Sequence, residues 1–216
     1  MSLSQQLRAR IRHLWVLKML TTAGAIAIFF WAYFWVMRNH VGEVAVMPVT
    51  ALDRLIGFHP GSFPLYASLW VYISLCTAFA RNLRELAAFG AASLGMSVAG
   101  LALFMLFPTR VPVTAIDWSL YPSLQFLKTV DVSGNACPSL HAAFCVFSGV
   151  VLWRELRSLA APAWLHWVNA LWCLGILLST VATRQHVALD AIAGIALGLA
   201  TAMAYLRALR PAPVPA

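Results

Sequence analysis

Six long apolar stretches constrain the fold of this chain more than any other feature. A helix that spans a bilayer needs about 20 predominantly apolar residues, and charged residues or prolines separate stretches that reach or approach this length. They cover residues 19–37, 64–80, 86–107, 138–153, 163–182 and 187–206. Only 10% of the 216 residues are charged, whereas a soluble domain carries about a quarter. We therefore expect an all-α integral membrane protein, a single domain over residues 1–216 built as a bundle of six transmembrane helices.

The two ends of the chain differ from the spans. Residues 1–18 place leucine, isoleucine and tryptophan at helical spacing among arginines, a pattern typical of a basic amphipathic helix at a membrane surface. The apolar run that begins at Met19 is too long for the apolar part of a signal peptide, so we expect the first span to be retained. Residues 207–216 form a short tail, which prolines interrupt from residue 211 onward.

The formal net charge of +8 is distributed by side of the membrane. If the N-terminus is cytoplasmic, most basic residues fall in inside segments, namely Arg8, Arg10, Arg12, Lys18, Arg81, Arg84, Arg154, Arg157, Arg207 and Arg210. This asymmetry follows the positive-inside rule and predicts a bacterial inner-membrane protein with both termini in the cytoplasm. Because the basic residues do not gather into one patch, we expect no nucleic-acid partner.

Acidic residues concentrate on the opposite side, which would be periplasmic. They are Glu43, Asp53, Asp117, Asp131 and Asp190. The outer connections, residues 38–63 and 108–137, are long enough to cover a site. In the first of them, Thr50 precedes "ALDRLIG", which predicts a short interfacial helix that ends before the turn at residues 59–61.

The stretch "CPSLHAAF" (137–144) predicts an anion site at the start of a helix. Proline suits the opening of a helix because its missing N–H has no partner to lose. We expect Pro138 to open the helix, with Ser139, Leu140 and His141 in its first turn. The unpaired N–H groups of such a turn attract anions, so phosphate is the expected ligand.

The stretch "TRQHVALDAIAG" (183–194) supplies a second group of polar residues. On a helix, His186 and Asp190 lie four residues apart on one face, within reach of a side-chain hydrogen bond. The carboxylate can hold the imidazole in one tautomer, which leaves the other ring nitrogen free to attack or to accept a proton. A carboxylate near the mouth of a span is costly without a partner, and His186 is the nearest candidate.

Two arginines are candidate ligands for phosphate, since a guanidinium binds phosphate oxygens in a fork and stays charged. Arg110 lies between prolines in "FPTRVP" (107–112), and Arg184 lies two residues before His186. The sequence leaves the roles of Lys128 and Asp117 open.

Small residues recur in the last span. Gly194 and Gly198 form a small-xxx-small face that permits close helix contact. We expect this helix to be central and to pack on several neighbours.

Taken together, the two outer motifs resemble a known family. "PSLHAAF", followed by "TRQHVALDAIAG", is similar to the second and third motifs, P-S-G-H and S-R-x5-H-x3-D, of the phosphatidic acid phosphatase type 2 superfamily. Leu140, in place of the motif glycine, resembles the branch that includes inositol phosphorylceramide synthases. The resemblance extends over the six spans in order.

The resemblance implies a phosphoryl-transfer site that needs no metal and no cofactor. It makes His186 the nucleophile that forms a phosphohistidine, Asp190 the residue that orients it, and His141 the acid that protonates the leaving oxygen. Ser139 and the backbone around Leu140 would hold phosphate oxygens. With water as the acceptor, the protein would be a phosphatase acting on a lipid phosphate monoester or pyrophosphate at the outer leaflet.

The chain departs from the family pattern at two places. The arginine of the third motif would stand at Thr180, whereas Arg184 is much closer to His186. The first motif, K-x6-R-P, is degraded, because Leu103 occupies the lysine position and only Arg110 remains as a remnant.

Other functions stay open on the sequence alone. An alcohol acceptor in place of water would make the protein a lipid phosphotransferase that moves a phospho-head group. His141 and His186 open two spans at similar depth and could ligate a haem iron, and a non-catalytic membrane scaffold is a further alternative. The sequence specifies neither the lipid substrate nor the oligomeric state.

Overall fold

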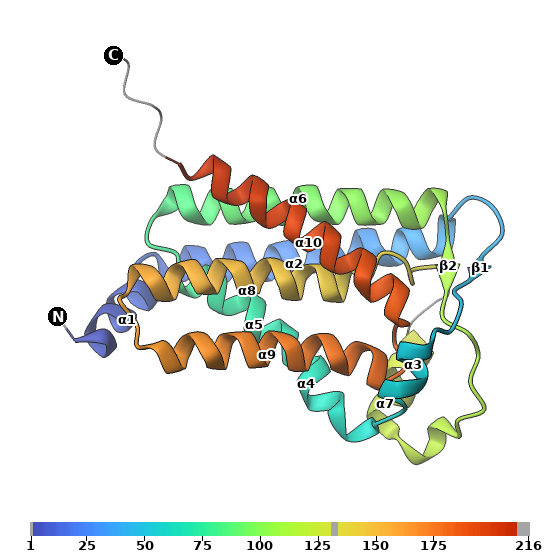
Figure 1. The fold of residues 1–216 in the computed structure, drawn as a ribbon. Coiled ribbons are helices and arrows are strands. Elements are labelled where there is room, and N and C mark those ends of the chain that lie inside the picture. The colour runs from blue at the N-terminus through green and yellow to red at the C-terminus, as the bar shows by residue number, and fades with distance from the viewer. Residues whose placement is uncertain (1, 131–133, 211–216) are drawn as a thin grey trace.

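Long helices run side by side along most of the chain (Figure 1). The structure is a computed structural model that describes residues 2–130 and 134–210. Within these residues the protein is nearly all-α, as expected. Asp131 and the proline-containing end of the tail, residues 211–216, lie outside the described residues.

The helices fall into a long and a short group. The long group comprises α1 (Leu3–Arg12), α2 (Trp15–Asn39), α5 (Leu69–Phe79), α6 (Leu83–Leu106), α8 (Leu140–Ser158), α9 (Ala163–Ala182) and α10 (Ala188–Ala208). The short group comprises α3 (Ala51–Ile56), α4 (Phe63–Ala67) and α7 (Pro122–Val130). Strands β1 (Ala45–Val46) and β2 (Thr109–Arg110) and two 3-10 turns, Pro60–Ser62 and Trp118–Leu120, complete the described elements.

Five helical segments of the described chain are long and apolar enough to cross a membrane. They are Trp15–Asn39, Pro60–Phe79, Leu83–Leu106, Ala163–Ala182 and Ala188–Ala208. The expected span at 138–153 corresponds to α8, which is not among them; its last turns carry Arg154, Glu155 and Arg157. A multi-pass membrane protein is thus supported, and the sixth span stays a prediction.

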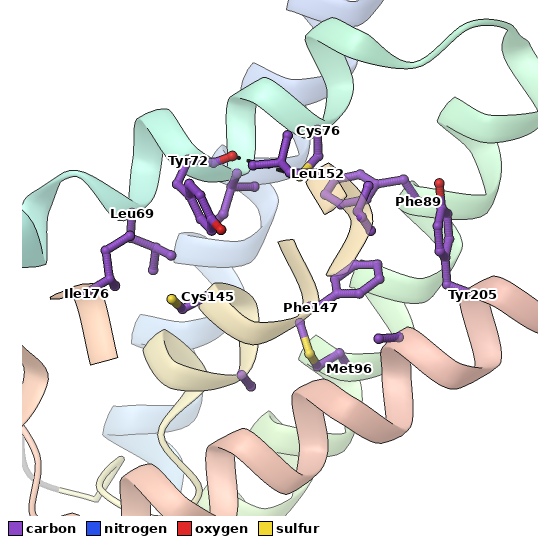
Figure 2. Close-up of a cluster of buried hydrophobic side chains, with 14 residues drawn as sticks. Leu69, Tyr72, Cys76, Phe89, Met96, Cys145, Phe147, Leu152, Ile176 and Tyr205 are labelled. Carbon is purple, nitrogen blue, oxygen red and sulfur yellow. Dashed lines mark hydrogen bonds between the residues drawn. The ribbon is translucent and has the colours of Figure 1, made fainter. Parts of the chain in front are cut away.

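The helix α8 is enclosed by the others. Its Phe147 is completely buried and stacks on Phe89 of α6, with 5.1 Å between the ring centroids. Figure 2 shows the surrounding cluster, in which Tyr72 of α5, Ile176 of α9 and Tyr205 of α10 converge on α8. A helix that is mostly covered by protein tolerates charges at its end if they find partners, and neighbouring helices provide the partners of α8.

Those partners form a charged network at one end of the bundle. Arg10 of α1 lies 2.8 Å from Glu155, and Arg154 bridges Glu155 and Glu85 of α6 at 2.5 and 3.0 Å. Both glutamates are buried, and Lys18 donates to carbonyl oxygens at the end of α5 and in the α5–α6 connection. As Figure 1 shows, α1, the α5–α6 connection and the last turns of α8 and α10 gather at this end. The segments expected on the inside therefore lie on one side.

The opposite end holds the two long connections. Strands β1 and β2 pair in parallel, with Ala45 opposite Thr109, and this pairing joins the two connections to each other. The hydroxyl of Thr109 accepts a hydrogen bond from the N–H of Cys137 at 2.8 Å, just before α8. The predicted short helix is confirmed as α3, which Thr50 caps.

The predicted close contact of the last helix is also confirmed. A Cβ atom at Gly194 would collide with the carbonyl oxygen of Ser139, and one at Gly198 would collide with that of Ala143. The N–H of Ser139 donates to the carbonyl oxygen of Asp190 at 2.9 Å. These contacts bring the starts of α8 and α10 together.

Candidate active site

The side chains of His186 and Asp190 meet at the start of α10. Nδ1 of His186 lies 3.3 Å from Oδ2 of Asp190, whose side chain is completely buried, whereas the His186 side chain is 11% exposed. One detail of the expectation is wrong: α10 begins at Ala188, so His186 precedes the helix instead of lying on it. The pair forms because the chain before the helix folds the imidazole back over the first turn.

The turn between α9 and α10 fixes the backbone of His186. The N–H groups of Gln185 and His186 both donate to the carbonyl oxygen of Thr180, at 3.2 and 3.0 Å. Arg184 takes the left-handed conformation, with φ of 57°, which lets the chain reverse after α9. Thr180, at the position of the family arginine, is fully buried and hydrogen-bonds to Leu177. It therefore lies in the last turn of α9, and its neutral side chain supplies no cation there.

His141, the second residue of α8, lies against Tyr66 of α4. The two rings stack almost in parallel, 4.0 Å apart between centroids and inclined by 9°. The imidazole also donates a hydrogen bond to the backbone of Tyr66, and it lies near His186. Nε2 of His141 is buried and has no partner within the described residues, so this nitrogen is available to a ligand.

Ser139 and Leu140 define the start of α8. Ser139 is the N-cap, and its hydroxyl oxygen accepts from the N–H of Ala142 at 3.1 Å. Leu140 is the first helical residue, so the helix begins two positions after Pro138, which was expected to open it. An anion at this helix start would face the N–H groups of the first turn and the positive end of the helix dipole.

The three candidate cations, Arg184, Lys128 and Arg110, have different contacts in the structure. Nη1 of Arg184 lies 3.4 Å from the carbonyl oxygen of Asp53, so part of its hydrogen-bonding capacity is directed at α3. Nζ of Lys128 donates to the carbonyl oxygen of Arg184 at 2.9 Å and lies 5.5 Å from the centre of the Trp118 ring. Arg110 is partly exposed in β2, next to the segment that leads into α8. Phosphate binding by Arg110 and Arg184 stays a prediction.

Two residues that contact the site were not assigned to it from the sequence. Tyr66 stacks on His141, and Asp53 hydrogen-bonds to the start of α10. The capping pattern at Thr50 did predict a helix around Asp53, but nothing in that pattern linked the helix to residues near 188. For Tyr66 the sequence contains no comparable signal.

The arrangement provides the groups that phosphoryl transfer requires. An imidazole oriented by a buried carboxylate is an activated nucleophile, and a second imidazole nearby can donate or accept a proton. A helix start can stabilise negative charge on phosphate oxygens. Within residues 2–130 and 134–210, no group of three or more histidine, cysteine, aspartate or glutamate side chains is placed to hold a metal ion.

The comparisons with known proteins give one match. The family model of the PAP2 superfamily matches residues 81–212, which is more than half of the chain. This region includes His141, His186 and Asp190. No curated protein and no solved structure is similar enough to the chain to count as a match. The match begins after α3 and α4, which supply Asp53 and Tyr66.

Proposed function

Because this chain belongs to the PAP2 superfamily, whose members are phosphoesterases or phosphotransferases, we propose that it is a membrane lipid phosphatase. Its substrate is a lipid phosphate monoester or pyrophosphate, and the reaction passes through a phosphohistidine. The observation that carries the proposal is the contact between His186 and the fully buried Asp190 at 3.3 Å. A buried carboxylate of this kind is costly in a membrane protein unless it serves a partner.

In the first step, His186 attacks phosphorus. The Nδ1–H of His186 donates to Asp190, which leaves the lone pair of Nε2 for the attack. A bond forms from Nε2 to phosphorus while the bond from phosphorus to the leaving oxygen breaks. The leaving oxygen keeps that electron pair and takes a proton from Nε2 of protonated His141, the nitrogen that has no protein partner within the described residues.

In the second step, water hydrolyses the phosphohistidine. Neutral His141 accepts a proton from the attacking water, and the electron pair of the phosphorus–nitrogen bond returns to His186. Inorganic phosphate leaves, and both imidazoles are restored to their starting protonation states. Through both steps, the first turn of α8 at Ser139 and Leu140, together with Arg110 and Arg184, balances the charge on the phosphate oxygens.

The proposal also assigns the site to a side of the membrane. The end of the bundle with His186 faces the periplasm of a bacterial inner membrane, and the end with the charged network faces the cytoplasm. Support comes from the basic residues, which are more numerous in the segments at the network end. Substrate would then be a lipid of the outer leaflet of that membrane.

A panel of phosphate donors tests the function. Purified protein is incubated with phosphatidic acid, phosphatidylglycerol phosphate and an isoprenyl pyrophosphate, and inorganic phosphate is measured for the wild type and for His186→Ala. We expect release from at least one donor by the wild type and none by the variant. Head-group exchange without phosphate release would instead identify a phosphotransferase. Full activity in His186→Ala would refute the mechanism.

A further inference from the structure

Asp53 links the first outer connection to the start of α10. It belongs to α3, 135 residues before its hydrogen-bond partner Ala188, and it lies outside the region that matches the PAP2 superfamily. Its side chain is completely buried, although α3 itself lies at the outer end of the molecule (Figure 1). A buried carboxylate at this position therefore needs an explanation from its contacts.

One carboxylate oxygen supplies the cap that α10 lacks. Val187, the N-cap residue of α10, makes no side-chain cap hydrogen bond. Oδ1 of Asp53 accepts a hydrogen bond from the N–H of Ala188 at 2.7 Å. Negative charge at a helix start is also favoured by the helix dipole. Asp53 thus does from a distant segment what an N-cap side chain usually does locally.

The position of that hydrogen bond matters for the site. Ala188 lies between His186 and Asp190 in the chain, two residues from each. Fixing the N–H of Ala188 therefore fixes the backbone that joins the two side chains, whose Nδ1 and Oδ2 atoms are 3.3 Å apart. No other described side chain hydrogen-bonds to the backbone of residues 186–190.

The other carboxylate oxygen holds Asp53 itself in place. Oδ2 accepts from the N–H of Thr50 at 2.7 Å and from its hydroxyl at 2.6 Å. Burial by itself raises the pKa of Asp53, but the hydrogen bonds from Thr50 and Ala188 and the nearby Arg184 outweigh it, so the pKa lies below its usual range. The carboxylate is therefore charged at neutral pH, and its two oxygens serve two segments.

We propose that Asp53 is a positioning residue of the phosphoryl-transfer site, which acts through Ala188 to hold His186 and Asp190 in register. The proposal rests on the proposed function, because it assumes that this pair carries the reaction. The carboxylate of Asp53 contacts Thr50 and the backbone N–H of Ala188, and it acts on the two side chains only through that backbone. This role of Asp53 implies that α3 helps to position the site and is not merely a surface segment between two spans.

The test compares substitutions at both ends of the hydrogen bond. Asp53→Ala removes the acceptor, and Asp53→Asn keeps an oxygen that can accept from Ala188. Ala188→Pro removes the donor; proline suits the first position of a helix, and the extended backbone of Val187, with φ of −101° and ψ of 166°, suits the residue before a proline. Asp117→Ala is the matched control, because Asp117 is exposed and, among the described residues, its side chain hydrogen-bonds within its own turn, to Ser119.

For each full-length variant, kcat, KM, the melting temperature and the inhibition constant for orthovanadate, an analogue of the phosphoryl transition state, are measured. A misplacement of about 1 Å can lower a rate about 100-fold, so we expect Asp53→Ala to lower kcat by about this factor with little change in KM. Inhibition by orthovanadate should weaken in parallel. Asp53→Asn should recover much of the loss, and Asp117→Ala should match the wild type.

The double variant separates positioning from support of the fold. If the two residues act through one hydrogen bond, Asp53→Ala combined with Ala188→Pro should be no slower than the slower single variant. The proposal is overturned if Asp53→Ala melts at a lower temperature but keeps wild-type kcat when assayed below that temperature. Should Asp53→Ala not fold, Ala188→Pro with wild-type kcat would overturn it equally. Inactive wild-type protein would count against the proposed function instead.

Discussion

Gly194 lies where α10 crosses the start of α8, and its replacement by alanine should disturb the site directly. A Cβ at this position would collide with the carbonyl oxygen of Ser139 and lie 3.1 Å from Cβ of Ala142. Neither atom is the end of a flexible side chain. Because non-bonded carbon atoms pack at about 3.5–4.0 Å, the two helix starts must move apart by a distance on the order of 1 Å.

This separation acts on the groups proposed to react. The starts of α8 and α10 carry His141 and Asp190, and the 2.9 Å hydrogen bond from Ser139 to Asp190 joins them. A shift of about 1 Å in a catalytic arrangement can cost about 100-fold in rate, which corresponds to about 2.7 kcal/mol of activation free energy. Overpacking of this kind also destabilises a fold by about 1–3 kcal/mol.

The assay is phosphate release by purified Gly194→Ala, with kcat measured well below the melting temperature of the variant. Gly95→Ala is the control, because Gly95 lies inside α6 and a Cβ there would meet nothing within 4 Å. Alanine is the better helix former, so the control should keep full activity and equal or higher stability. Wild-type kcat in Gly194→Ala would refute the reasoning that this crossing sets the geometry of the site.

Three further predictions concern residues around the site. Asp190→Asn should lower kcat by about 10⁴-fold, as expected for a carboxylate that sets the tautomer of a catalytic imidazole; His186→Ala should be inactive, and donor turnover checks both. Tyr66→Phe should keep the stacked ring on His141 and most of the activity, whereas Tyr66→Ala should lose both the stacking and most of the activity. Measuring kcat for the two variants checks this prediction. Folding lowers the pKa of Asp53. Its contribution to stability is therefore complete above its unfolded pKa of about 3.9 and is lost as the pH falls through its folded pKa. In that pH range, the stability of Asp53→Asn against acid unfolding should depend less on pH than that of the wild type.

Hydropathy predicted most of the membrane helices correctly because the signal is local. A run of apolar residues identifies a segment that is stable in lipid whatever its neighbours are. The helix α8 is the exception, because hydropathy alone did not explain the charges at its end. Its Arg154 and Glu155 reduce its apolar character, and only the packing of α1 and α6 around it shows that Arg10 and Glu85 complete the network of these charges.

The contact between His186 and Asp190 could be predicted in part. The spacing of four residues and the cost of a buried carboxylate both indicated the pair. The sequence did not reveal that the helix starts only at Ala188, because the preceding turn depends on two N–H groups that reach back to Thr180 at the end of α9. The roles of these side chains in catalysis stay predictions.

The sequence by itself determined which segments are apolar helices, how the charges sort between the two ends, and which two motifs carry the ionisable groups. Each of these follows from composition or from spacing within a few residues. Only the tertiary structure decided that Asp53 caps α10 and that Tyr66 stacks on His141. Such contacts join residues far apart in the chain, and they exist only because α3 and α4 lie against helix starts that the packing of α8 and α10 has brought together.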